Sequence, residues 1–275
     1  MNELIYERID TLPPLPKTIL ELEEFKKTPE RTSEDLLEII QQDPLVVATI
    51  LKVANSAMFG FRSTIETTSR ALTLLGVNFT LSIAFSTSIK NVIQSNLKAY
   101  GIGSNDFLET IQMSSSLLSL WIGQFNFDLK EELMLPTFLQ ETGKFIISDI
   151  IVNQNRHEDF LKDLQTSKEI ACVEKKYLST TTSEVTASVF KKWSLSEKLI
   201  NTIEFVDDIA SCPPCCILEA KILNIIKTIC PIINPLSSEH IVQGLQKAKE
   251  FELDVGALEV AIKQLQSKLN SKNIH

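Results

Sequence analysis

The sequence predicts an all-α protein, and three observations point to that class. Apolar residues recur at spacings of three and four along several stretches, which is the period of one face of a helix. Only 8 of the 275 residues are glycine, and the Asn-Gly and Asp-Gly pairs that are typical of tight hairpins do not occur. The composition, with 44% apolar and 23% charged residues, indicates a chain with a large buried core.

The first predicted helices have recognisable start signals. An apolar stripe over residues 15–25 follows a proline pair. Thr32 or Ser33 can cap the next helix, and Asp43 precedes Pro44, whose fixed backbone suits the first helical position. The helix that Pro44 opens is apolar almost all the way round, so we expect it to be central.

Later stretches repeat this pattern. A helix over residues 64–75 is expected to stop at Gly76, and Asn78 can cap the run that follows. Further helices are expected over the stretches 106–122, 131–152, 183–193 and 196–206, with more helices after Pro214.

The candidate linkers of the chain suggest that it has three parts. They lie near residues 100–105, 179–182 and 211–214. We expect an N-terminal helical lobe over about 1–100, a second lobe over about 101–206, and a helical extension over 207–275 that packs on the core. Trp193 is expected to anchor the core between the lobes.

Charge and targeting patterns limit the partners and the location. The formal net charge of −8 opposes binding to nucleic acids and to anionic membranes. The first ten residues lack the pattern of a secretory signal, and no apolar stretch reaches the roughly 18 residues that span a bilayer. We therefore expect a soluble, cytoplasmic chain.

Several motifs follow one another in order between residues 10 and 206. They are LPPLPK (12–17), QQDPLVVATILKVANSAMFGF (41–61), Ile65, Ala71, LLG (74–76) and SEVTASVFKKW (183–193). Together they resemble the HDOD family, bacterial signal-transduction modules related to HD-domain phosphohydrolases. The resemblance implies a multi-helix HD-like core and a regulatory role. The LPPLPK segment itself is expected to be a rigid lead-in to the first apolar helix, the alternative being a polyproline ligand for an aromatic groove.

The resemblance also indicates which positions would hold metal in a catalytic relative. An HD enzyme binds one or two divalent cations with an early His, an adjacent His-Asp pair and a late Asp, and these cations activate water. Gln140 and Glu141 stand at the positions of the pair, and the later positions correspond to Thr182 and Val206. The stretch 110–114, which resembles the early position, contains no histidine. The imidazoles of the metal site are therefore missing.

The ligand inventory of the whole chain agrees. His157, His240 and His275 are far apart in the sequence, so no histidine pair lies at helical spacing. Glu141 is a lone carboxylate in this stretch, expected to be a solvated or N-terminal helix residue or a partner of Lys144. We expect no metal, no cofactor and no phosphohydrolase activity.

The cysteines form the strongest candidate for a different kind of functional site. Cys212 and Cys215 have the two-residue gap of a zinc knuckle or a redox pair, and Cys216 adjoins them. A helix N-terminus nearby would lower the pKa of Cys215 or Cys216. Because no histidine and no βαβ pattern accompany them, we favour reduced structural thiols over zinc or redox chemistry.

Two regions could bind a ligand or a partner. The corner at Asn55, Ser56 and Phe59 is expected to be a packed helix ending, with a binding groove as the alternative. Lys144 could hold a phosphate in a degenerate cleft.

The sequence thus predicts a non-enzymatic signalling module that binds other regulatory proteins. The resemblance adds control of motility or gene expression as an expectation. The family-like region and the extension use up the chain, so we expect the signal to arrive from outside it. The alternative is a catalytically inactive cleft that senses a nucleotide or cyclic dinucleotide.

Overall fold

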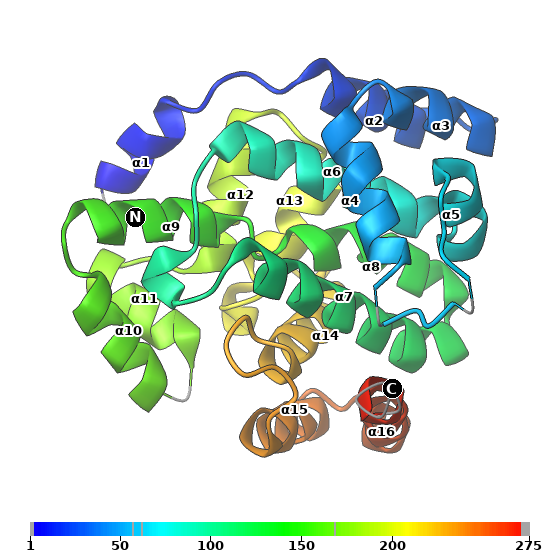
Figure 1. Cartoon of the computed structure of the whole chain (residues 1–275). Coiled ribbons are helices and arrows are strands. Elements are labelled where there is room, and N and C mark those ends of the chain that lie inside the picture. The colour runs from blue at the N-terminus through cyan, green and yellow to red at the C-terminus, as the bar shows by residue number, and fades with distance from the viewer. Residues whose placement is uncertain (1–2, 57, 62, 168, 271–275) are drawn as a thin grey trace.

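The computed structural model describes residues 3–56, 58–61, 63–167 and 169–270. These residues form α-helices and short 3-10 helices and no strand, so the all-α prediction is confirmed (Figure 1). The helices are, in chain order, α1 (Glu3–Asp10), α2 (Lys17–Lys27), α3 (Ser33–Gln41), α4 (Pro44–Ala54), α5 (Thr68–Leu75), α6 (Val77–Ile93), η1 (Lys98–Tyr100), α7 (Ser104–Trp121), η2 (Ile122–Gln124), α8 (Phe127–Leu139), α9 (Gly143–Asn153), α10 (His157–Thr166), α11 (Ile170–Leu178), α12 (Thr182–Lys192), α13 (Glu197–Glu204), η3 (Ile209–Ser211), α14 (Ile217–Ile229), α15 (Ser238–Glu250) and α16 (Val255–Asn270).

The predicted start signals of α3 and α4 are confirmed. The Thr32 hydroxyl accepts a hydrogen bond from the amide of Asp35, whose carboxylate accepts one from the amide of Thr32. The Asp43 carboxylate accepts hydrogen bonds from the first amides of α4, and Pro44 occupies the first helical position. Both caps satisfy amides that have no partner within their own helix.

The start of α6 differs from the prediction. Gly76 adopts a φ of 85°, which a residue without a side chain tolerates, and it both ends α5 and precedes α6. The helix therefore begins at Val77, so Asn78 lies inside it and donates its amide to the Glu131 carboxylate instead of capping. The predicted helix over 64–75 is shorter, because Thr67 caps α5 at Thr68.

The helix predicted over 131–152 is two helices. Pro136 lies inside α8 and has no amide hydrogen to donate to the preceding turn. The chain then turns at residues 140–142 before α9 begins at Gly143. Gly143 is required here because a Cβ would lie 2.5 Å from the Thr182 carbonyl oxygen of α12. This turn carries Glu141 into the interior of the molecule.

One hydrophobic core runs through the described residues from Ile5 in α1 to Leu265 in α16. Helices α9, α12 and α13 pack in sequence, while α7 packs against α8 and α16. Helices α2 and α3 lie at the top of the view in Figure 1, and α15 and α16 lie at the bottom. No helix in the described ranges is long and apolar enough to cross a membrane.

The N-terminal segment is attached to the second half of the chain by polar contacts. Arg8 of α1 forms an ion pair with Asp149 of α9 at 2.6 Å. The indole nitrogen of Trp193, at the end of α12, donates to the carbonyl oxygen of Pro13 at 3.0 Å. Trp193 is buried, so it joins the lead-in segment to the core.

Candidate functional site

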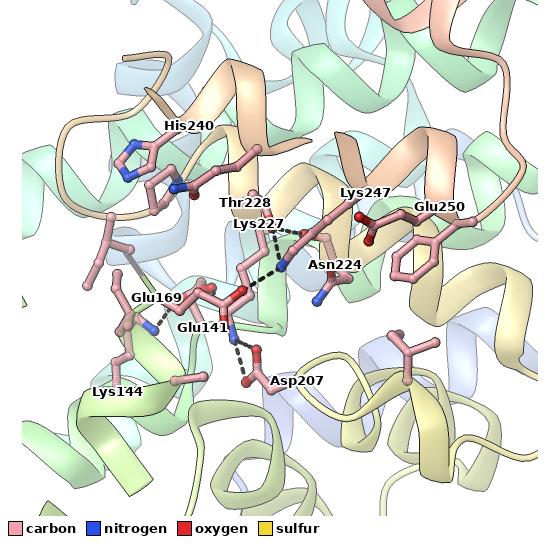
Figure 2. Close-up of a pocket in the computed structure, with 17 residues that line it drawn as sticks. Glu141, Lys144, Glu169, Asp207, Asn224, Lys227, Thr228, His240, Lys247 and Glu250 are labelled. Atoms are coloured by element: carbon pink, nitrogen blue, oxygen red, sulfur yellow. Dashed lines mark hydrogen bonds and ion pairs between the residues drawn. The ribbon is translucent and has the colours of Figure 1, made fainter. Parts of the chain in front are cut away.

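A polar cavity of about 260 Å³ lies where the α8–α9 turn, α11, the turn after α13 and α14 meet, and α15 lines its other side (Figure 2). Glu141, Lys144, Asp207 and Lys227 line its inner part. Charged groups thus converge on one place from segments that are far apart in the sequence.

Lys144 is the cation of the inner cluster. Its ammonium lies 2.7 Å from Glu141 Oε2 and 3.2 Å from Glu174 Oε1, and it donates to Thr182 Oγ1 at 2.9 Å. The residue is fully buried. Lysine is almost never buried to this degree unless it is paired, and here two carboxylates provide the pairing.

Glu174 of α11 completes this cluster. One of its oxygens accepts hydrogen bonds from the Tyr100 and Thr182 hydroxyls at 2.8 and 2.6 Å, and the other accepts the amide of Thr182 at 2.7 Å. Burial, together with the negative charge of Glu174, raises the pKa of Tyr100 well above its ordinary value. Tyr100 therefore stays a hydrogen-bond donor to the carboxylate.

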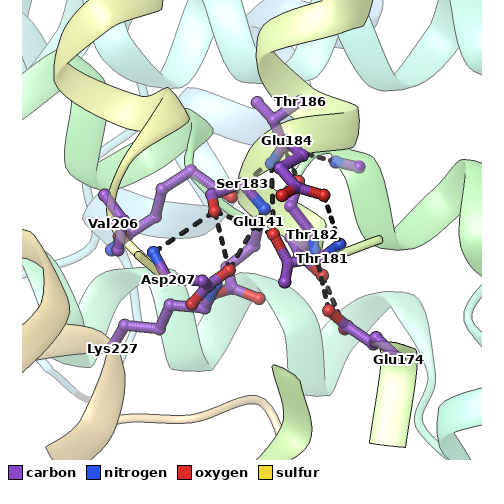
Figure 3. A network of polar contacts seen from close by, with 12 residues as sticks. Glu141, Glu174, Thr181, Thr182, Ser183, Glu184, Thr186, Val206, Asp207 and Lys227 are labelled. Carbon is purple, nitrogen blue, oxygen red and sulfur yellow. Dashed lines mark hydrogen bonds and ion pairs between the residues drawn. The ribbon is translucent and has the colours of Figure 1, made fainter. Parts of the chain in front are cut away.

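Asp207 and Lys227 form a second pair beside the first (Figure 3). The Lys227 ammonium lies 2.7 and 2.8 Å from the two oxygens of Asp207 and 3.8 Å from Glu141 Oε1. The Ser183 hydroxyl also donates to Asp207, at 2.8 Å. Burial alone would raise the pKa of Asp207, but the nearby Lys227 outweighs it and the pKa is lowered. Burial would lower the pKa of Lys227, and Asp207 and Glu141 raise it instead.

One of the four positions that the resemblance indicated lines this cavity, and the other three are buried near it in the chain or through contacts. Glu141 lines it, and Thr182 contacts both Lys144 and Glu174. Gln140 is buried, and its side-chain oxygen has no hydrogen-bond partner within the described residues. The Val206 side chain is buried, and its carbonyl accepts a hydrogen bond from Asn224.

Two sequence-based expectations need correction here. Glu141 is not solvated: it is 7% exposed and paired with Lys144, as one of the alternatives held. Nor is it a lone carboxylate, because folding brings Glu174 and Asp207 close to it. A carboxylate lies one residue after Val206, at Asp207, which lines the cavity.

Lys144 and the corner at residues 55–59 do not form one groove. The Asn55 amide side chain donates to the carbonyls of Leu51 and Ile65 and accepts from the amide of Ile65, so it holds the loop after α4. The Ser56 hydroxyl donates to Gln112. Phe59 packs edge-to-face on Phe79 and lines a different cavity, of about 320 Å³. Ala57 lies outside the described residues.

Three of the thiols, those of Cys212, Cys215 and Cys216, lie at the start of α14. Cys212 Sγ is 3.7 Å from Cys216 Sγ, and Cys215 Sγ is 4.0 Å from Cys216 Sγ. Cys216 caps α14, yet burial and the neighbouring thiols raise its pKa to about 12. Burial also raises the pKa of Cys212 and that of Cys230. The expected lowering at Cys216 is thus wrong, because burial and the neighbouring thiols disfavour the thiolate.

The donor set does not fit the cations of an HD hydrolase. In the part of the chain that the structure describes, no group of three or more His, Cys, Asp or Glu side chains is placed to hold a metal ion. His157 lies on α10 and His240 on α15, while His275 falls outside the described residues. The carboxylates that remain face two ammonium groups, which repel a divalent cation.

Sequence reasoning missed Glu174, Asp207 and Lys227. Asp207 had a signal, since it directly follows a position that was singled out. Lys227 also had one, because it lies four residues after the buried Leu223 and three before the buried Cys230, at core spacing on α14. Glu174 directly precedes Lys175 and Lys176 on α11, and such a run of charged residues ordinarily indicates a solvated helix face.

Comparison with known structures shows that several solved proteins share this fold. A provisionally named phosphohydrolase from Shewanella amazonensis SB2B matches with a TM-score of 0.70 and 20% identity over 97% of this chain and 94% of its own. A provisionally named signal transduction protein from Marinobacter aquaeolei VT8 also has a TM-score of 0.70, with 16% identity over 98% of this chain and 63% of its own. A virulence factor from Campylobacter jejuni is 25% identical, with a TM-score of 0.56 and coverage of 94% and 95%.

The fold and the cleft define an all-helical protein whose cleft carboxylates are paired with lysines. The HDOD domain model matches residues 12–209, and the chain belongs to the HDOD family. An uncharacterized protein of Treponema pallidum (strain Nichols) is 24% identical over 219 residues, which is 76% of this chain. The chain spans only 40% of the length of that curated relative.

Proposed function

We propose that the protein is a non-enzymatic signal-transduction module that acts by binding other regulatory proteins. Membership of the HDOD family supports a signalling role. The observation that carries the non-enzymatic part is the pairing in the cleft, where the carboxylates Glu141, Glu174 and Asp207 face the ammonium groups of Lys144 and Lys227.

The chemistry of the cleft supports this proposal. Metal-dependent hydrolysis needs open coordination positions on a cation that acidifies water. In this cleft Lys144 and Lys227 already occupy the space between the carboxylates. The resemblance implies that Gln140 and Thr182 stand at positions that hold metal ligands in HD enzymes. The two ammonium groups would repel a metal cation from this cleft, and we therefore describe the protein as a pseudoenzyme.

A ligand-sensing role in the same cavity is the second candidate. The cavity is polar, and Lys227, Lys247 and His240 line it. However, Lys247 pairs with Glu169 at 3.3 Å, and Lys227 pairs with Asp207. A nucleotide phosphate would have to compete with these internal carboxylates, so the cavity offers little free positive charge to a polyanion.

The partners that we propose are other signalling proteins, with motility or gene expression as the regulated process. Direct nucleic-acid binding is disfavoured because the chain carries a formal net charge of −8. Protein surfaces do not require a net positive charge, so they remain compatible with this composition.

Two assays distinguish an enzyme or a sensor from an interaction module. The purified chain is incubated with phosphomonoesters, phosphodiesters and cyclic dinucleotides in Mn²⁺ or Mg²⁺, with the Glu141→Gln/Asp207→Asn double variant as the matched control. We expect no turnover above that of the control. Turnover that the double variant abolishes would contradict the proposal, and a nucleotide that raises the melting temperature would favour the sensor.

The interaction itself is tested by affinity capture from native lysate, with an unrelated acidic helical protein as the control bait. We expect a regulatory protein that is retained by this chain and not by the control. The pair is then purified and must bind at a defined stoichiometry in solution, measured by calorimetry. Loss of binding with pure components would contradict the proposal.

A further inference from the structure

Lys227 occupies an unusual place for a lysine side chain. Its ammonium contacts both oxygens of Asp207 and lies 3.8 Å from Glu141, while only 11% of the side chain is exposed. The Asp207 side chain is 6% exposed. A carboxylate in such surroundings is costly unless a cation accompanies it.

No other cation is bound to Asp207 in the described ion pairs. Lys144 makes its two ion pairs with Glu141 and Glu174. The serine hydroxyl that reaches Asp207 donates a hydrogen bond but brings no charge. The charge of Asp207 is therefore balanced by Lys227.

The origin of Lys227 in the chain is informative. The family model ends at residue 209, whereas Lys227 lies on α14, 20 residues after Asp207. A helix outside the matched region thus reaches back and inserts its ammonium between two carboxylates of the matched region. Carboxylates such as these two are the oxygen ligands that hard divalent cations accept.

We infer that the Lys227 ammonium takes the place of a divalent cation between Asp207 and Glu141, so that α14 supplies this cleft with a cation of its own. The inference concerns the cleft and holds whichever partner the proposed function involves. It predicts that a cation added from solution can replace the ammonium once the side chain is shortened.

The test uses the full chain with Lys227→Ala. Removal of the ammonium leaves Asp207 uncompensated, so the melting temperature is expected to fall by about 10 °C in metal-free buffer. Mn²⁺ accepts one or two carboxylates and keeps its remaining ligands as water, so the vacated volume and the adjoining cavity suit it. At ten times its dissociation constant, Mn²⁺ is expected to raise the melting temperature of this variant by about 3 °C.

Three variants serve as controls. Lys227→Met removes the charge but fills the space, so it is expected to lose stability without responding to Mn²⁺. Lys247→Ala removes another lysine of the same cavity, which pairs with the half-exposed Glu169. For this variant we expect neither a large loss of stability nor a response to Mn²⁺. Lys227→Ala/Asp207→Asn removes both charges, so it is expected to melt above Lys227→Ala in metal-free buffer and to lose most of the Mn²⁺ response.

The inference stands only if Lys227→Ala loses stability in metal-free buffer and Mn²⁺ then raises its melting temperature. It is overturned if Mn²⁺ raises the wild type and Lys227→Ala equally, if it raises neither, or if Asp207→Asn restores no stability. Should Lys227→Ala fail to fold, the double variant decides the matter: it is expected to fold, and its failure would show that Lys227 does more than balance Asp207. Capture of the signalling partner is measured separately, so a failed partner assay leaves this test unaffected.

Discussion

At the scale of the residue, Lys144 shows how much a single charge can determine. It is fully buried, and its ammonium has Glu141, Glu174 and Thr182 as polar neighbours and lies 5.3 Å from the centre of the Tyr100 ring. A buried ion pair of this kind adds little net stability over apolar packing, but breaking it leaves a carboxylate without its counter-ion.

Replacing Lys144 with methionine is therefore expected to be costly. Methionine keeps the volume of the side chain but leaves Glu174 without a counter-ion and Glu141 with only the more distant Lys227. We expect Lys144→Met to lower the free energy of unfolding by about 3–5 kcal/mol, measured by urea denaturation. Lys176→Met is the matched control, because Lys176 pairs with Asp163 at 2.7 Å while its side chain is 65% exposed. The control should change by less than about 1 kcal/mol, and equal losses in the two variants would refute the electrostatic explanation.

Asp207 makes a prediction about pH. Its pKa is lowered in the folded protein, because the attraction of Lys227 outweighs burial. A depressed pKa contributes stability that is fully present above the unfolded value of about 4 and is lost as the pH falls toward the folded value. The difference in free energy of unfolding between wild type and Asp207→Asn should therefore narrow by at least about 1 kcal/mol as the pH falls from 6 to 2.5.

The measurement is the free energy of unfolding of both proteins across that range. Other carboxylates are common to the two proteins, so their titration cancels in the difference. A difference that stays constant with pH would mean that the pKa of Asp207 is the same in the folded and the unfolded protein, and a difference that widens as the pH falls would mean that the folded pKa is raised.

At the scale of the element, the turn between α8 and α9 does the most to form the cleft. It carries Glu141 inward, and Gly143 directly after it lets α9 approach α12 closely. The amide of Gly143 donates to Thr186 Oγ1 at 2.8 Å, so the two helices are joined by a polar contact as well as by packing.

Gly143→Ala is expected to separate these two helices. The new Cβ would lie 2.5 Å from the Thr182 carbonyl oxygen, and backbone cannot move aside as a side-chain tip can. We expect a loss of about 1–3 kcal/mol, measured by chemical denaturation. Gly256→Ala is the control: Gly256 is exposed in α16, and the nearest atom to its added Cβ is 3.4 Å away. That substitution should stabilise the protein by up to about 1 kcal/mol, because alanine is the better helix former.

Elements with local signals could be predicted from the sequence, and those set by long-range contacts could not. The capping of α3 and α4 depends on residues within one turn, so Thr32 and Asp43 were identified. The break before Gly143 depends on the distance to α12, which periodicity does not contain. For that reason the pattern over 131–152 reads as one continuous helix.

The candidate site follows the same division. The neighbourhood of Glu141 and Thr182 could be found from family motifs, because those motifs lie in continuous segments. Glu174 and Lys227 could not be joined to it, because their place depends on how α11 and α14 fold over the α8–α9 turn. The charge balance of a cleft is a property of the packed molecule, and no single segment reveals it.

At the scale of the whole molecule, the continuous core connects the parts that the sequence divided near residues 100 and 206. Trp193 contacts Pro13 in the N-terminal segment, and Trp121 lies in α7, which packs against α16. Both indoles are buried. The two tryptophans thus report on different parts of the core.

We expect the described core to unfold as one cooperative unit. Trp121→Phe leaves the fluorescence of Trp193, and Trp193→Phe leaves that of Trp121, so each variant follows one region. For each variant, the urea transition followed by tryptophan fluorescence is compared with the transition that circular dichroism gives for the same variant. The two transitions should coincide. A tryptophan signal that changes well before the helix signal would show that one lobe unfolds independently.

The lysine on α14 also determines how the cleft depends on its surroundings. A bound metal ion can be stripped by a chelator or lost when its free concentration falls, whereas an ammonium on a covalent stem stays at the same local concentration for the life of the chain. The Asp207 carboxylate is therefore compensated in metal-poor and metal-rich conditions alike.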